Sequence, residues 1–115
     1  MNWRSVDQVL PGLPATITGA ATISNNVTTN DPRFIVVTVR HAPGASGTLQ
    51  LVDYNDADQA DSSGVVMQSM ALAAGDETVL RYNATTNGLL RNLIKIRVSG
   101  AAALSVTQVN CCVID

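Results

Sequence analysis

The sequence predicts an all-β protein: a single antiparallel β-sandwich of jelly-roll or Greek-key type with an extended N-terminal arm. The β-branched residues Val, Ile and Thr make up 31 of the 115 residues, and such side chains pack well on a pleated sheet. Lys and Glu, which surface helices use heavily, occur once each. Seven or eight short strand-like segments with regularly spaced turn signals are typical of a sandwich or barrel.

Residues 1–14 are predicted to form an arm that precedes a sandwich domain at 15–115. Apolar residues recur in the arm at helical spacing, which suits one or two amphipathic turns before two prolines end them. Two interpretations stay open. The arm either folds its Trp back onto its own core, or docks on a neighbouring subunit and acts in assembly. The candidate partner-binding residues are Trp3, Val6, Leu10 and Leu13.

The first half of the domain reads as strands in order. Residues 15–23 alternate between an apolar face and a ladder of Thr side chains, as a half-buried strand does. Residues 33–41 are apolar on both faces through the middle of the segment and therefore predict a central strand. After a Pro- and Gly-rich loop, residues 48–52 predict a strand with Leu49 and Leu51 facing inward.

The second half continues this pattern. Residues 65–72 predict a strand with Met67 and Met70 on opposite faces, and a further strand follows at 77–82. Turn residues at 83–88 then lead to a segment that alternates cleanly from 90 to 99, and a last strand runs to the end of the chain. The alternation places Ile94, Ile96 and Val98 inward, opposite Ile35, Val37 and Val39, with Lys95 and Arg97 outside.

The sequence contains few of the residues and motifs that catalysis uses. His41 is the single histidine, and at a strand end it is predicted to be a surface or capping residue. There is no G-x-S-x-G elbow, P-loop, G-x-G-x-x-G or H-E-x-x-H motif. Adjacent carboxylates on a strand point to opposite faces, which does not suit glycosidase chemistry. We therefore expect no enzyme activity and no cofactor.

An acidic loop at residues 53–64 is the candidate metal site. It concentrates oxygen ligands of the kind that calcium prefers. The loop lacks the Gly and terminal Glu of an EF-hand loop, so a solvated loop whose side chains bind their own backbone is the competing interpretation. The candidate ligands are Asp53, Asn55, Asp56, Asp58 and Asp61.

Charge, cysteines and aromatic content restrict the partners. A net charge of −2 and only 3% aromatic residues disfavour direct nucleic-acid binding and a sugar-binding platform. No run approaches the roughly 20 apolar residues of a membrane-spanning helix, and no secretory signal is visible. Cys111 and Cys112 are adjacent on a strand, so we expect a reduced structural pair with one thiol inward and one outward.

In architecture, the arm, the strand series at 15–114 and loops such as 53–64 resemble the small β-sandwich structural proteins of tailed bacteriophages, such as capsid decoration (cement) proteins. The resemblance implies a homo-oligomer, often a trimer, that binds the major capsid protein or other virion proteins and stabilises the head shell. It implies assembly in the host cytoplasm and a place in the virion. The alternatives are another phage neck, tail or fibre subunit, and a calcium- or carbohydrate-binding sandwich module.

Overall fold

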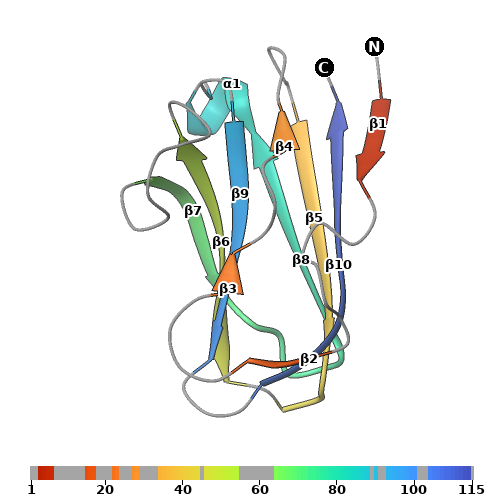
Figure 1. The fold of residues 1–115 in the computed structure, drawn as a ribbon. Coiled ribbons are helices and arrows are strands. Elements are labelled where there is room, and N and C mark those ends of the chain that lie inside the picture. The colour runs from red at the N-terminus through yellow and green to blue at the C-terminus, as the bar shows by residue number, and fades with distance from the viewer. Residues whose placement is uncertain are drawn as a thin grey trace.

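The computed structural model describes residues 3–6, 15–17, 22–23, 27–28, 34–44, 46–54, 64–88, 90, 93–100 and 104–114. In these ranges the chain forms two antiparallel sheets that pack face to face (Figure 1). The one helix of the described residues, α1 (Ala84–Asn87), is a single turn. The predicted antiparallel β-sandwich is therefore confirmed.

The first sheet, sheet A, has the strand order β1-β10-β5-β8, and β2 also pairs with β10. Strands β1 and β2 occupy one edge of β10 in succession, because β1 pairs with residues 111–114 and β2 with residues 104–106. The predicted central strand is confirmed, since β5 lies between β10 and β8 (Figure 1). The strands are β1 (Trp3–Val6), β2 (Ala15–Ile17), β5 (Phe34–His41), β8 (Glu77–Asn83) and β10 (Leu104–Ile114).

The second sheet, sheet B, has the order β3-β9-β6-β7, and β4 also pairs with β9. Consecutive strands β6 and β7 form a hairpin within this sheet. The connections from β5 to β6, β7 to β8, β8 to β9 and β9 to β10 each cross to the other sheet. The strands are β3 (Thr22–Ile23), β4 (Val27–Thr28), β6 (Gly47–Tyr54), β7 (Val65–Ala71) and β9 (Leu93–Gly100).

The core fills the space between the sheets with alternate residues of each long strand. The predicted inward faces are confirmed, because every member of them is 0–1% exposed, while the side chains of Lys95 and Arg97 are only half-buried. The confirmed inward residues are Ile35, Val37, Val39, Leu49, Leu51, Ile94, Ile96 and Val98.

Residues 3–6 differ from the sequence-based expectation, because they form a strand rather than a helical turn. Trp3 pairs with Ile114 and Val6 with Cys111 across an antiparallel ladder. The backbone of an edge strand offers a row of unpaired N–H and C=O groups, and pairing with them outweighs a weak helical spacing of three apolar side chains. Leu10, Leu13 and the rest of the predicted helical segment lie outside the described residues.

The expectation of opposite faces for Met67 and Met70 is also wrong, since both pack against the core. The cause is a register shift in the β6–β7 ladder. Leu51 pairs with Gln68 and the next residue, Val52, pairs with Val66, so Met67 is an extra residue without a partner. Such a bulge breaks the period of two, and the strand can then turn both methionines inward.

Candidate functional site

A pocket on the outer face of sheet A is the candidate site. One residue from each of the neighbouring strands β10, β5 and β8 lies side by side there, since Ile114 pairs with Phe34 and Phe34 pairs with Asn83. Phe34 alternates with the buried Ile35, so its ring faces away from the core and is 38% exposed. A large apolar side chain exposed at this level marks a surface that can bind a partner.

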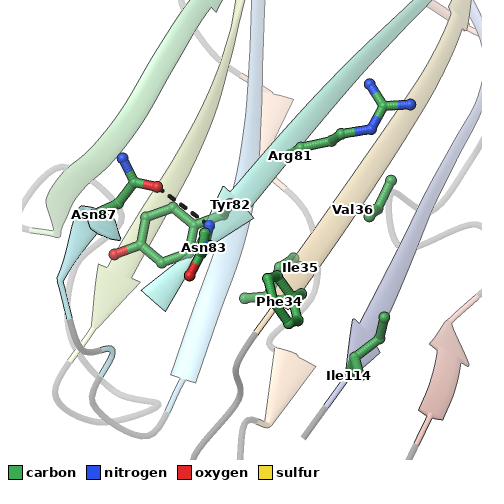
Figure 2. A pocket seen from close by; sticks show the side chains of 8 residues that line it. All are labelled: Phe34, Ile35, Val36, Arg81, Tyr82, Asn83, Asn87 and Ile114. Carbon is green, nitrogen blue, oxygen red and sulfur yellow. Dashed lines mark hydrogen bonds between the residues drawn. The ribbon is translucent and has the colours of Figure 1, made fainter. Parts of the chain in front are cut away.

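The pocket has a volume of about 410 Å³ and combines apolar walls with a polar rim. Figure 2 shows Phe34 between Ile114 and the β8 side chains, with the Arg81 guanidinium extending away from the other pocket residues. The residues that line this surface, here called the Phe34 pocket, are Phe34, Ile35, Val36, Arg81, Tyr82, Asn83, Asn87 and Ile114.

Helix α1 fixes one rim of the pocket through its capping bonds. The Asn83 side chain accepts a hydrogen bond from the Thr85 backbone N–H at 3.0 Å, which caps the helix. The Asn87 side chain in turn accepts from the Asn83 backbone N–H at 3.2 Å (Figure 2). The helix ends at Gly88, whose φ of 113° is rarely adopted by other residues. Hydrogen bonds from the backbone to these two Asn side chains therefore fix the shape of the rim.

Tyr82 anchors the same rim from inside the sandwich. It is 1% exposed, and its hydroxyl donates to the Gly88 carbonyl oxygen. Burial, and secondly the negative charge of Asp53, raise the pKa of Tyr82 above its usual 10.0. The phenol therefore stays protonated at neutral pH and acts as a donor that holds the end of the helix.

The described residues that line the pocket are mostly apolar, with an Arg and two Asn side chains. The eight described lining residues include no His, Cys, Asp, Glu, Lys or Ser, so they offer no nucleophile–base pair and no metal-ligand set. The pocket presents an exposed aromatic ring and an Arg, and both residue types are enriched at protein interfaces. The geometry therefore favours a protein-binding surface.

Of the predicted arm residues, the structure brings Trp3 to this site. Its pairing with Ile114 puts the backbone of β1 beside the pocket's edge. Val6 lies three residues further along β1 and pairs with Cys111. Leu10 and Leu13 lie outside the described residues. The assembly role of the arm stays a prediction.

Of the predicted calcium ligands, Asp53 is described, and it lies in the interior. It is 4% exposed and pairs with Ile94 in the β6–β9 ladder. Asn55, Asp56, Asp58 and Asp61 lie outside the described residues. In the part of the chain that the structure describes, no three His, Cys, Asp or Glu residues are grouped as a metal site requires. Calcium binding by this loop stays a prediction.

His41 is buried and not a surface residue as expected. Its Nε2 lies 2.7 Å from the Thr78 hydroxyl, and Nδ1 lies 2.9 Å from the Ala42 carbonyl oxygen. Because a carbonyl only accepts, Nδ1 donates to the Ala42 carbonyl, and Nε2 forms its hydrogen bond with the Thr78 hydroxyl. The same hydroxyl accepts from the Ala73 backbone N–H at 2.8 Å. His41 therefore ties β5 to the turn between β7 and β8.

The cysteines agree with the expectation of one inward and one outward thiol. Both are free; Cys111 is fully buried, and Cys112 is half-buried on the outer face of sheet A. Burial raises the pKa of the Cys112 thiol above its usual value. Neither thiol is thus a ready nucleophile at neutral pH.

Sequence reasoning did not single out Phe34, Arg81 and Ile114 as a site. They come from three strands that are distant along the chain, so only the pairing of β8, β5 and β10 brings them together. One signal was present: Phe34 is out of phase with the inward residues Ile35, Val37 and Val39. A large ring on the outer phase of a central strand indicates an exposed apolar position.

No family model matches the sequence, and no curated protein sequence matches it. Solved structures match it across nearly its whole length. A chain from Bacillus endospore appendages, which form disulfide-linked pili, has 13% identity and a TM-score of 0.53, covering 99% of this chain and 87% of that chain. The SPBc2 prophage-derived protein YomS has 10% identity and a TM-score of 0.52, covering 99% and 94%.

A third similar structure is the CBM36-1 domain of a multidomain xylanase from the hindgut metagenome of Trinervitermes trinervoides. It has 8% identity and a TM-score of 0.51, covering 96% of each chain. Likeness at these identities shows a shared β-sandwich fold and leaves the function to the site. Among the described residues, no helix is both long and apolar enough to span a membrane.

Proposed function

We propose that this protein is a non-enzymatic structural protein of a tailed-phage virion, and specifically a capsid decoration protein that binds the outer head surface and stabilises the shell. The observation that carries this proposal is the Phe34 pocket. It is an exposed aromatic and aliphatic surface with an Arg at its rim, without catalytic or metal-binding groups among its described lining residues. Such a surface suits a protein partner.

The strand order supports the proposal. If β1 with β2, and β3 with β4, each count as one interrupted strand, the sheets contain four strands each. Each sheet then combines strands from the beginning and from the end of the sequence. This strand order is the one expected of the two Greek keys of an eight-stranded jelly roll. Viral capsid and lectin domains use this architecture. The fold shared with a prophage-derived protein and a pilus chain is consistent with a subunit that assembles.

The mechanism that we propose is additive burial. Each protein copy covers the Phe34 pocket against a coat subunit, the major capsid protein, and the arm with Trp3 adds a second contact beside it. A modest gain per copy is multiplied by the symmetry of the shell and by the homo-oligomer that we propose the protein forms. The protein would then reside on the virion and bind neither nucleic acid nor membrane.

The test uses the phage whose genome encodes the chain. Heads purified from a deletion phage are mixed with the protein, and bound protein is measured after sedimentation, together with the temperature at which the heads release DNA. We expect binding and a raised release temperature. Phe34→Asp should lose binding, whereas the matched change Val65→Asp, at a 53% exposed position on sheet B, should not. Absence of the protein from wild-type particles would refute the proposal.

A binding module is the second candidate, because the CBM36-1 domain shares the fold. Carbohydrate modules present exposed rings to the sugar. Here Tyr54 and Tyr82 are 0–1% exposed, which leaves Phe34 as the exposed ring whose side chain is described. For calcium, the melting temperature is measured with chelator and with excess calcium. A chelator-sensitive wild type beside an insensitive variant with Asp56, Asp58 and Asp61 changed to Asn would favour a calcium-binding module.

A further inference from the structure

Strand β8 is an edge of sheet A. It pairs with β5 in an unbroken register from Glu77 to Asn83, and no other described strand pairs with it. In an antiparallel sheet, alternate residues of an edge strand direct their N–H and C=O groups away from the neighbouring strand. Among the described strands, β8 thus offers a row of backbone donors and acceptors that a further strand can use.

The edge of β8 carries charged side chains but lacks three other features by which proteins block strand addition: a proline, a bulge and an inward-pointing charge. Its sequence contains no Pro or Gly, its ladder has no bulge, and its inward residues are the uncharged Thr78, Leu80 and Tyr82. Edge strands that must stay alone carry such features. Strand β7, the edge of sheet B, has one of them, since the extra residue Met67 interrupts its register. The two edges therefore differ in their capacity to pair.

The outward face of β8 has a self-complementary charge pattern. Glu77 and Arg81 are both exposed, and the half-buried Val79 lies midway between them. When two such strands pair in antiparallel fashion about a two-fold axis at Val79, Glu77 of each copy lies directly opposite Arg81 of the other. Val79 then lies opposite itself. Directly opposite residues have Cβ atoms about 4.5–5.5 Å apart, so both charge pairs and the Val pair can form contacts.

We propose that the β8 edge binds a second copy of this chain in this register, so that the two A sheets join into one continuous sheet across a two-fold axis. The contact is isologous: the same five residues, 77–81, serve both copies. Glu77 already contacts Arg40, with Nη2 and Oε2 3.3 Å apart, in an exposed pair. A carboxylate accepts several hydrogen bonds, so Glu77 can bind Arg81 of the second copy as well. This inference does not depend on the proposed function.

Charge reversal provides a sharp test by sedimentation equilibrium of the full chain over a wide concentration range. Wild type should dimerise. Glu77→Arg places like charges opposite each other twice, and so does Arg81→Glu; each should weaken the dimer about tenfold or more. An equimolar mixture of the two variants restores both opposite-charge pairs, as does the double variant, and both should recover dimerisation. Arg40→Gln is the control, because it removes only the contact within one copy.

A second measurement locates the contact. Hydrogen exchange at low and high protein concentration should show protection that grows with dimerisation at alternate amides of residues 77–81, and not at the bulged β7 edge. Melting curves show that the variants, all at exposed positions, remain folded. A wild type that stays monomeric at millimolar concentration overturns the proposal, as does a dimer that the single reversals do not weaken. Head binding is measured separately, so either proposal can fail alone.

Discussion

Gly64 lies against the outer face of sheet B, and a single methyl group there should destabilise the protein. Val52 and Tyr54 alternate with the inward Leu51, so they face away from the core, yet both are 0% exposed. A Cβ at Gly64 would lie 2.4 Å from Val52 Cγ1 and 2.6 Å from Tyr54 Cζ. Carbon atoms do not approach this closely, so the Gly64 backbone must move outward or the Tyr54 ring must shift.

The size of the effect follows from this overpacking. Forcing one extra carbon into a filled site costs about 1–3 kcal/mol. For a domain of this size, 1 kcal/mol corresponds to about 4 °C in melting temperature, so Gly64→Ala should lower it by about 4–12 °C. Differential scanning calorimetry and urea unfolding measure the change. The Lys95 ammonium lies 5.1 Å from the centroid of the Tyr54 ring, and this contact should be weakened as well.

Two variants control the Gly64 experiment. Gly75→Ala adds a methyl group where no atom lies within 4 Å, so it should be neutral or slightly stabilising. Val52→Ala removes the nearest clashing atom, and in combination with Gly64→Ala it should cost less than the two single changes added together. If Gly64→Ala melts at the same temperature as Gly75→Ala, the close approach of Gly64 to Val52 and Tyr54 is wrong.

Four further expectations follow from the structure. Ile96→Ala should lower the free energy of unfolding by about 2–5 kcal/mol in urea titrations, because it leaves a cavity at a 1% exposed site. The pKa of Tyr82 is raised in the folded state, so its contribution to stability is complete below about pH 10 and is lost as the pH rises through the folded-state pKa. Tyr82→Phe should therefore remove this part of the loss of stability at alkaline pH, measured by urea unfolding at several pH values. Iodoacetamide should modify native Cys112 slowly below pH 9 and Cys111 only on unfolding, which mass spectrometry of timed samples can follow. Deleting residues 1–14 removes β1, which pairs along the edge of β10, and should leave a cooperatively unfolding sandwich that binds heads more weakly; an unfolded product would show that β1 is needed for folding rather than for assembly.

Much of the fold was predictable because burial imposes a period of two on long strands. The alternation of Ile94, Ile96 and Val98 needs no tertiary information, and it is confirmed by their burial. The period fails where pairing is irregular. The sequence of residues 65–72 does not predict the bulge at Met67, because the extra residue is defined by the pairing with strand β6.

The candidate site was less accessible to sequence reasoning. His41 was expected at the surface because it ends a strand, but Thr78 and the Ala42 carbonyl satisfy both ring nitrogens, which removes the cost of burial. The partners of a polar side chain depend on which strands meet, and local sequence does not contain that information. The same applies to Phe34, whose exposure was readable from its phase but whose pocket required β8 and β10.

The position of β10 in the sheet has a consequence for the order of folding during synthesis. It follows the other nine described strands in the sequence, yet β1, β2 and β5 all hydrogen-bond to it. While the ribosome still holds residues 104–114, the first two strands lack their partner, and the central strand can form its ladder with β8 alone. The amino-terminal strands must therefore stay unpaired until residues 104–114 have left the exit tunnel, so cooperative folding of the sandwich cannot precede the emergence of β10. A nascent chain stalled just short of β10 should be cleaved readily by a protease, and one extended by a linker long enough to clear the exit tunnel should resist it.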